Sequence, residues 1–137
     1  MSTITINSLP EFEQAVATYL AALQKQQRQL AQDVAYTIAE NIVVGGAYSP
    51  GTPVDLGHAR ASWQMDLNGA PVSSGEAMAA GAVGVKLGDQ VNMTNDAPYI
   101  RRLEYGWSKQ APAGFVRMIV NSFELIADTI SKQVPAP

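Results

Sequence analysis

The stretch SLPEFEQAVATYLAALQKQQRQLAQDVAYTIAENIVV, residues 8–44, decides the fold of this 137-residue chain. It contains no glycine, and its only proline, Pro10, falls where the first turn of a helix tolerates one. Ser8 and Glu11 have the spacing of a capping box at a helix start. Apolar residues then recur at the spacings of one helix face: Phe12, Val16, Tyr19, Leu20, Leu23, Leu30, Val34, Ile38 and Ile42. The stretch therefore predicts one long amphipathic helix over residues 8–44.

The length of this helix has a consequence for its packing. About 35 residues, at a rise of 1.5 Å each, reach roughly 50 Å, which is about three times the usual helix length. A globule of 137 residues cannot cover all of that surface. We therefore expect the helix either to kink or to pack on a neighbouring subunit.

Shorter elements fill the rest of the chain and are separated by glycine and proline. In order, we expect a loop at 45–60, a strand at 61–67, a turn at 69–74, a helix at 76–87, a strand at 90–94, a short helix at 96–105 and a final helix at 112–133. Trp63, Met65 and Leu67 alternate on one face of the first strand. Gly106 is placed to end the short helix as a left-handed cap.

The helix at 76–87 is ambiguous, because Ser73 and Glu76 have capping-box spacing whereas Gly81 and Gly84 weaken a helix by up to about 1 kcal/mol each.

In the final helix an apolar stripe is formed by Phe115, Ile119, Val120, Phe123, Ile126, Ala127 and Ile130. Together the elements predict a single α+β domain over residues 1–137. In it the long N-terminal helix and the C-terminal helix pack on a small antiparallel sheet, whose strands and helices occupy residues 61–111.

The composition excludes several classes of site. The chain has no cysteine, which excludes disulfides, thiolate metal sites and cysteine nucleophiles. Its net charge of −3 argues against nucleic-acid binding as the main task, because backbone binding needs clustered Lys and Arg. No apolar run approaches the roughly 20 residues that cross a bilayer, and residues 1–10 lack the pattern of a signal peptide. We expect a protein that is made in the cytoplasm and has no membrane contact.

Charge is sparse and unevenly placed. Charged residues make up 15% of the chain, where about 25% is typical, so part of the surface is expected to be buried against other chains. Arg101, Arg102, Lys109 and Arg117 cluster in one segment whose only acid is Glu104. This cluster is either a solvated basic face or a contact with the acidic first helix of another subunit, which would fix register. The four cations could also touch DNA phosphates transiently, but they are too few for tight binding.

An enzyme would need a nucleophile, a base or a metal cluster. His58 is the only histidine, so no histidine-based zinc site can form. Asp55 and Ser62 lie near it in sequence, but a Ser–His–Asp triad is defined by geometry and not by local spacing. The glycines of residues 45–57 lack the order of a phosphate-binding loop. We therefore expect no catalytic residue, no cofactor and no metal; a hydrolase or nuclease that uses His58 is the less supported alternative.

Two blocks of sequence carry a resemblance. The first is TPVDLGHARASW, residues 52–63; the second is NDAPY, residues 95–99, followed by LEYGWSKQAPAG, residues 103–114. In order and approximate spacing they resemble the HK97 gp10-like family of bacteriophage neck and tail-component proteins, and the long first helix is also similar. Leu56 and His58 depart from the family's pattern. The motif residues are Pro53, Asp55, Gly57, Arg60, Trp63, Asn95, Pro98, Tyr99, Leu103, Glu104, Gly106, Pro112 and Gly114.

This resemblance implies a structural virion protein of a tailed bacteriophage, assembled in the host cytoplasm. It implies a homo-oligomeric ring, a hexamer, at the head–tail junction, where it joins the head-closure protein to the tail terminator and tail tube proteins. Genomic DNA would pass through the lumen without specific binding. The resemblance implies no enzymatic activity and no cofactor. A soluble tail-morphogenesis factor that is not retained in the virion is the alternative.

The first block also has a physical interpretation of its own. Pro53 fixes φ and stiffens the loop, and Asp55 is able to cap the turn that begins at Gly57. Arg60 offers a planar fork that fits a carboxylate. Glu104, in the second block, is a candidate partner for that fork.

The aromatic and glycine positions of the blocks suit packing and backbone geometry. Trp63 and Tyr99 each combine a large apolar area with one polar group. We expect these two residues and Leu103 chiefly to build the core, with contact to another chain as the alternative. Gly106 and Gly114 are expected to serve the backbone conformation.

Overall fold

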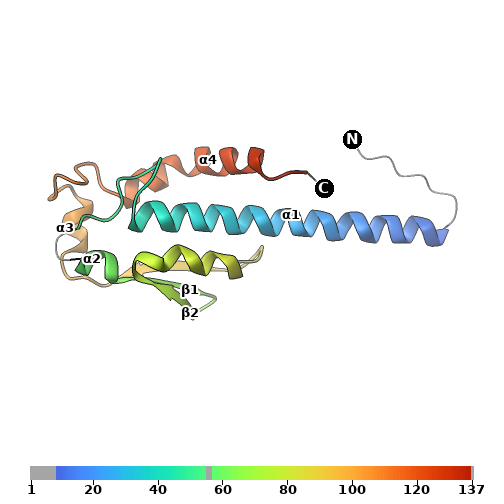
Figure 1. The fold of residues 1–137 in the computed structure, drawn as a ribbon, viewed down its shortest axis with the longest axis horizontal. Helices are drawn as coiled ribbons and strands as arrows, with labels where there is room; N and C mark the ends of the chain where they lie inside the picture. The colour runs from blue at the N-terminus through green and yellow to red at the C-terminus, as the bar shows by residue number, and fades with distance from the viewer. Residues whose placement is uncertain (1–8, 55–56, 137) are drawn as a thin grey trace.

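The computed structural model describes residues 9–54 and 57–136 and has an α+β fold. Its elements are, in order, α1 (Leu9–Val43), α2 (His58–Ala61), β1 (Trp63–Leu67), β2 (Ala70–Ser74), the 3₁₀ helix η1 (Gly75–Gly84), β3 (Val91–Asn95), α3 (Ile100–Glu104) and α4 (Val116–Gln133). Figure 1 shows α4 on one side of α1, and η1 (yellow-green) with the sheet on the other side. The predicted fold class, two long terminal helices on a small antiparallel sheet, is confirmed.

The sheet is antiparallel and has the order β2-β1-β3, with β1 at its centre. Trp63 and Met65 are buried, as the alternation predicted, and Met65 pairs with Met93 of β3. The turn predicted at 69–74 is wrong, because β2 occupies most of that segment. The chain reverses earlier, at Asn68 and Gly69, both of which have positive φ (54° and 89°). Pro71 is tolerated in β2 because that strand lies at the sheet edge.

The helix predicted at 76–87 is present as η1, but it is a 3₁₀ helix and ends at Gly84. The expected capping box is wrong: the Ser73 hydroxyl donates to the Met78 carbonyl at 2.6 Å instead of capping the helix start. Small side chains allow η1 to lie close to its neighbours. A Cβ added at Gly81 would lie 2.4 Å from Ser73 Oγ, so the sequence of η1 is matched to this tight packing.

The final helix starts later than predicted, at Val116 instead of residue 112, because residues 111–115 form a turn. Ile119, Ile126 and Ile130 of the predicted stripe are buried. Val120 and Phe123 are not, with exposed fractions of 67% and 49%, so the predicted stripe was too wide. The short helix predicted at 96–105 is confined to α3, and Gly106 follows it with φ 89° as predicted.

The helix α1 runs from Leu9 to Val43 and agrees closely with the predicted range of 8–44; Ser8 lies outside the described residues. Figure 1 shows it straight, with its N-terminal part extending beyond the layers that flank its C-terminal part. The first buried side chain of the described part of α1 is Ala35. Of the two expected outcomes for an overlong helix, a kink is not observed, and no described residue covers the apolar face of its first half.

No helix among residues 9–54 and 57–136 combines the length and hydropathy needed to cross a membrane.

Candidate assembly interface

The two motif blocks meet at the C-terminal end of α1, around Thr52. This residue has no exposed surface, and its hydroxyl donates to the Ile42 carbonyl at 2.8 Å. The same hydroxyl accepts a 2.7 Å hydrogen bond from the indole N–H of Trp63. The Thr52 amide donates to the Val43 carbonyl at 3.0 Å. Thr52 thus joins the end of α1 to the start of β1, and Trp63 belongs to the core as predicted.

Arg60 does not pair with Glu104, so that predicted ion pair is wrong. The Nε of Arg60 donates to the Thr52 carbonyl at 2.8 Å, and Nη2 lies 3.5 Å from the Val44 carbonyl. Val44 directly follows α1, and Thr52 belongs to the loop that returns to the end of α1, where its amide bonds to the Val43 carbonyl. The guanidinium of Arg60 therefore binds backbone carbonyls and stabilises the loop that follows α1.

Glu104 instead caps the start of α4. Its Oε1 accepts hydrogen bonds from the amides of Phe115 (2.7 Å) and Val116 (2.8 Å), and its Oε2 accepts one from the amide of Arg117 (3.2 Å). The first amides of a helix lack intrahelical partners and favour negative charge. Gly114 makes room for the carboxylate: its φ is 89°, and an added Cβ would lie 2.5 Å from Glu104 Oε1. Glu104 and Gly114 together set where α4 begins.

Two amide side chains close the same end of the molecule. Gln110 Nε2 donates to the Val54 carbonyl, and Gln110 Oε1 accepts from the Val54 amide, both at 2.9 Å. Asn95 Nδ2 donates to the Ala59 carbonyl at 2.6 Å, while its Oδ1 accepts from the Ala97 amide at 2.9 Å. These reciprocal contacts fix the second block against the first.

The remaining motif positions occupy several environments. Asp55 lies outside the described residues, and Gly57 has φ 79° where it precedes α2. Pro98 and Pro112 are exposed, and Gly106 follows α3 with positive φ. Pro53 is buried and lines a cleft of about 390 Å³ with Tyr99, Leu103, Trp107 and others. Leu103 packs against the core, but Tyr99 is 37% exposed, so the core prediction is wrong for Tyr99.

The cations of the second block are at the surface and lie beside exposed aromatic rings. The guanidinium of Arg102 lies 4.8 Å from the centroid of the Trp107 ring, and that of Arg117 lies 5.0 Å from the centroid of Tyr105. Trp107 is 72% exposed and Tyr105 is 66% exposed. Arg101 and Lys109 of the same segment are also exposed. We call these exposed side chains together the aromatic–basic patch: Arg101, Arg102, Tyr105, Trp107, Lys109 and Arg117.

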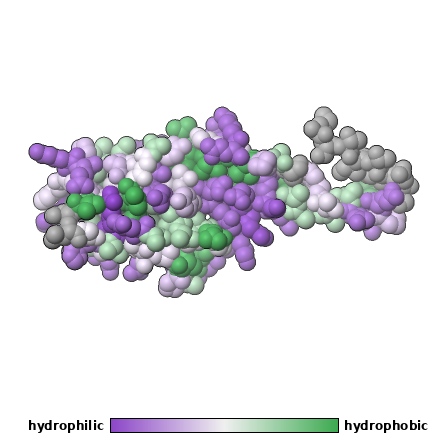
Figure 2. Space-filling view, in the orientation of Figure 1, coloured by the Kyte–Doolittle hydropathy of each residue, from purple (hydrophilic) through white to green (hydrophobic). Residues whose placement is uncertain are grey.

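The aromatic–basic patch combines apolar rings and positive charges on one exposed segment. Figure 2 shows apolar residues (green) reaching the surface beside hydrophilic ones (purple) at the end that carries α3. A cation over a ring face is favourable and holds both side chains in place. Rigid tryptophan, tyrosine and arginine side chains are the residue types that dominate protein–protein contacts. The patch therefore combines positive charge with side-chain types that are common at protein–protein contacts.

The described residues contain no group of three or more His, Asp or Glu side chains that could hold a metal ion. His58 is exposed at the first position of α2, and its carbonyl accepts from the Ser62 hydroxyl at 2.8 Å. The Ser62 hydroxyl therefore donates to backbone and not to the imidazole. The geometry gives no support to a serine nucleophile activated by His58.

Several residues of this end were not singled out from the sequence. Thr52 and Gln110 were quoted only as letters of the motif blocks, and Ser49, whose hydroxyl donates to the Phe115 carbonyl at 2.9 Å, was not considered. Their contacts described above join residues that are 10 to 66 positions apart in sequence, and no local spacing indicates such contacts. Tyr105 and Trp107 were detectable, because they lie between Arg102 and Lys109 of the predicted basic cluster.

A comparison of the chain with protein families, curated proteins and solved structures found no match in any of the three.

Proposed function

We propose that this chain is a structural subunit of a tailed bacteriophage particle, a neck or tail-completion protein at the head–tail junction. In this proposal its copies form a homo-oligomeric ring, a hexamer, between the head-closure protein and the tail terminator and tube. Genomic DNA passes through the lumen. The proposal starts from the resemblance of residues 52–63 and 95–114 to phage neck and tail-component proteins.

The observation that carries the proposal is that the polar and the aromatic side chains of those two blocks have different surroundings. Their polar side chains, such as Arg60, Asn95 and Glu104, are used on internal hydrogen bonds. Tyr105 and Trp107, which follow Glu104 in the second block, are the two most exposed aromatic side chains among the described residues. Exposed aromatic surface is costly unless a partner covers it. The inward residues thus build a rigid platform, and the outward residues present a contact surface.

The charges of the patch indicate the kind of partner. Four of its six residues are cations, on a chain whose net charge is −3. A neighbouring subunit or head-closure protein with an acidic surface would complement them, and such complementarity fixes orientation as well as partner. The mildly acidic remainder of the ring would repel DNA over about a Debye length of 10 Å, which favours passage over binding.

The proposal is tested in particles produced by the strain that encodes the chain. Mass spectrometry of purified particles should find the protein at the copy number of one ring. Complementation with Trp107→Ala should yield heads and tails that fail to join. Tyr36→Ala, which removes a half-exposed aromatic side chain of α1 outside the patch, should join them as the wild type does.

Two results would count against this proposal. Absence of the protein from joined particles would show that it is a morphogenesis factor and not a structural subunit. Normal joining with Trp107→Ala, in a variant whose circular dichroism and melting temperature match the wild type, would show that the patch is not the contact.

A further inference from the structure

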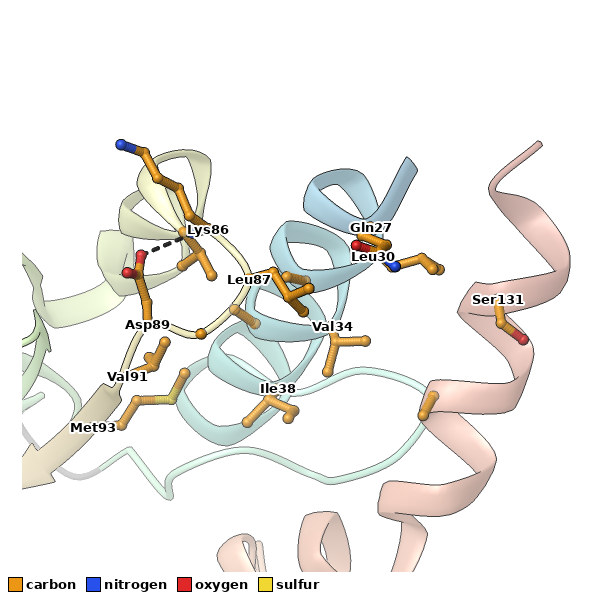
Figure 3. A pocket seen from close by; sticks show the side chains of 15 residues that line it. Gln27, Leu30, Val34, Ile38, Lys86, Leu87, Asp89, Val91, Met93 and Ser131 are labelled. Atoms are coloured by element: carbon orange, nitrogen blue, oxygen red, sulfur yellow. Dashed lines mark hydrogen bonds between the residues drawn. The ribbon is translucent and has the colours of Figure 1, made fainter. Parts of the chain in front are cut away.

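A second surface, distinct from the aromatic–basic patch, lies along α1. A groove of about 680 Å³ is lined by α1 side chains that we call its floor: Gln27, Leu30, Ala31, Val34 and Ile38. Figure 3 shows Leu30, Val34 and Ile38 between the segment around Leu87 and the helix α4, which contributes Ser131. Leu87 is 68% exposed although it lines the groove. The lining is predominantly apolar and has no covering element among the described residues.

The floor of the groove continues beyond its walls. Toward the N-terminus, the same face of α1 carries Phe12, Val16, Tyr19, Leu20 and Leu23. At 100° per residue, these five positions and the floor positions lie within an arc of about 120° around the helix. We call residues 10–24 the α1 arm. Leu20 is 51% exposed and Phe12 is 44% exposed, so the apolar face of the arm is uncovered.

The arm and the groove floor are mirror images in sequence. Each apolar arm position has a floor position at the same distance from Lys25. The pairs are Phe12 with Ile38, Val16 with Val34, Tyr19 with Ala31, Leu20 with Leu30, and Leu23 with Gln27. Four of the five pairs join two apolar residues. Such a stripe is self-complementary when two copies of the helix run antiparallel, because every contact is then made twice.

We propose that the groove receives the α1 arm of a second copy of this chain, with the two α1 helices antiparallel about a twofold axis beside Lys25. One interface of this kind covers both arms and both grooves. Lys25 is about 200° around the helix from Leu23, so the axis does not bring the two lysines together. On the opposite side of α1, Lys25 lines a separate hollow with Gln133 and Pro135.

The geometry favours a helix over a compact ligand as the occupant. A small apolar molecule would fill the walled part of the groove and leave the arm uncovered. Ala127, Ser131 and Gly88 line the walls with small side chains, which leaves room for the side chains of another helix. A helical segment as long as the arm, about 22 Å at 1.5 Å per residue, spans the whole floor from residue 27 to 38.

The twofold pair goes beyond the proposed function and does not rest on it. A twofold contact has no polarity, whereas a head–tail junction has two different sides. Where the proposed ring also forms, the pair is therefore a form of the free subunit.

Cysteine cross-linking tests the register directly, because the chain has no native cysteine. The double variants Leu20→Cys/Leu30→Cys and Phe12→Cys/Ile38→Cys should form disulfide-linked dimers on mild oxidation. Within one helix, positions 20 and 30 are about 15 Å apart, too far for a disulfide in the same chain. The variants Phe12→Cys/Leu30→Cys and Leu20→Cys/Ile38→Cys match a staggered parallel arrangement and serve as controls. Dimers in the control pairs, or in none of the four, would overturn the proposal.

Solution mass provides the second measurement. The wild type should be a dimer by light scattering, and Leu20→Asp should raise the dimer dissociation constant about 100-fold or more, because symmetry places the charge at two buried sites. Leu125→Asp, on the exposed side of α4, should leave the dimer unchanged. A monomeric wild type, or a dimer that is insensitive to Leu20→Asp in a folded variant, would show that a second copy does not occupy the groove.

Discussion

Replacing Glu104 by alanine should destabilise the chain more than any other single change to a charged side chain at the end of the molecule that carries α3. The Glu104 carboxylate is only 15% exposed and accepts three backbone amides at the start of α4, at 2.7, 2.8 and 3.2 Å. The loss leaves those amides without a partner at a place where water has limited access. Because Glu104 also fixes where α4 begins, the effect should reach the whole helix.

The magnitude follows from the contacts. Loss of a helix-capping side chain costs about 1 kcal/mol and up to about 2 kcal/mol, and hydrogen bonds to a charged group contribute about 1.5–3 kcal/mol. These terms describe the same carboxylate and do not add fully. The ion pair with Arg117, at 3.7 Å and with Arg117 50% exposed, adds little. We expect a loss of about 3 kcal/mol in the free energy of unfolding, which lowers the melting temperature by about 10 °C in a chain of this size.

Urea denaturation followed by circular dichroism at neutral pH measures this change. Glu104→Gln keeps one acceptor oxygen and should lose about half as much as Glu104→Ala, because it lacks the charge. Glu124→Ala, on the exposed side of α4, is the matched control and should change stability by less than about 0.5 kcal/mol. If Glu104→Ala fell within that same small range, the capping role of Glu104 would be refuted.

Two other changes address separate contacts. Thr52→Val should cost about 2 kcal/mol of unfolding free energy in the same assay, because it removes the acceptor for the buried Trp63 indole N–H; a neutral result would mean that the indole has another partner. Hydrogen bonding from Asn68 is the largest cause that holds the pKa of Asp89 below its ordinary value of 3.8. Because the pKa of Asp89 is lower in the folded chain, ionised Asp89 stabilises the fold at pH values above 3.8. This stabilisation is lost as the pH falls through the lower pKa of Asp89 in the folded chain. The difference in melting temperature between wild type and Asp89→Asn should therefore be constant near neutral pH and shrink in acid; a difference that persists in acid would contradict it.

The sequence was most informative where local physics decides the outcome. The helix α1 was predicted nearly to the residue, because a long run free of interior glycine and proline, with apolar residues at helical spacing, has no competing structure. The central strand was also predicted, since the alternation of Trp63, Met65 and Leu67 is a property of the strand itself. The strand β2 was missed although Asn68-Gly69, a strong hairpin signal, precedes it. Pro71 obscured it, because a proline is compatible with a strand only at an edge, and edges are known only once the sheet is.

The candidate site was less predictable, because its contacts are long-range. From the sequence, an ion pair between the planar guanidinium of Arg60 and the carboxylate of Glu104 was predicted, because the two groups are chemically complementary. The fold gives both side chains backbone partners instead, at the end of α1 and at the start of α4. The partner of Arg60 is a carbonyl of the loop after α1 and the partners of Glu104 are the first amides of α4, and both positions depend on where distant elements meet. The four predicted cations are exposed, and the structure adds the rings of Trp107 and Tyr105 beside Arg102 and Arg117, while their role as a subunit contact stays a prediction.

Only 15% of the residues are charged, and the exposed apolar side chains of the chain lie on particular elements. Uncovered apolar side chains gather on the α1 arm, at Tyr105 and Trp107, and on α4 at Phe123 and Leu125. These surfaces differ in chemistry, and the difference separates their partners. The α1 stripe bears no charge and is symmetric in sequence, as the proposed pairing with a second copy needs, whereas the aromatic–basic patch is positively charged, as the proposed contact with an acidic partner needs. A variant that blocks one surface should therefore leave the contact made by the other intact, which would not hold if a single nonspecific apolar surface drove both.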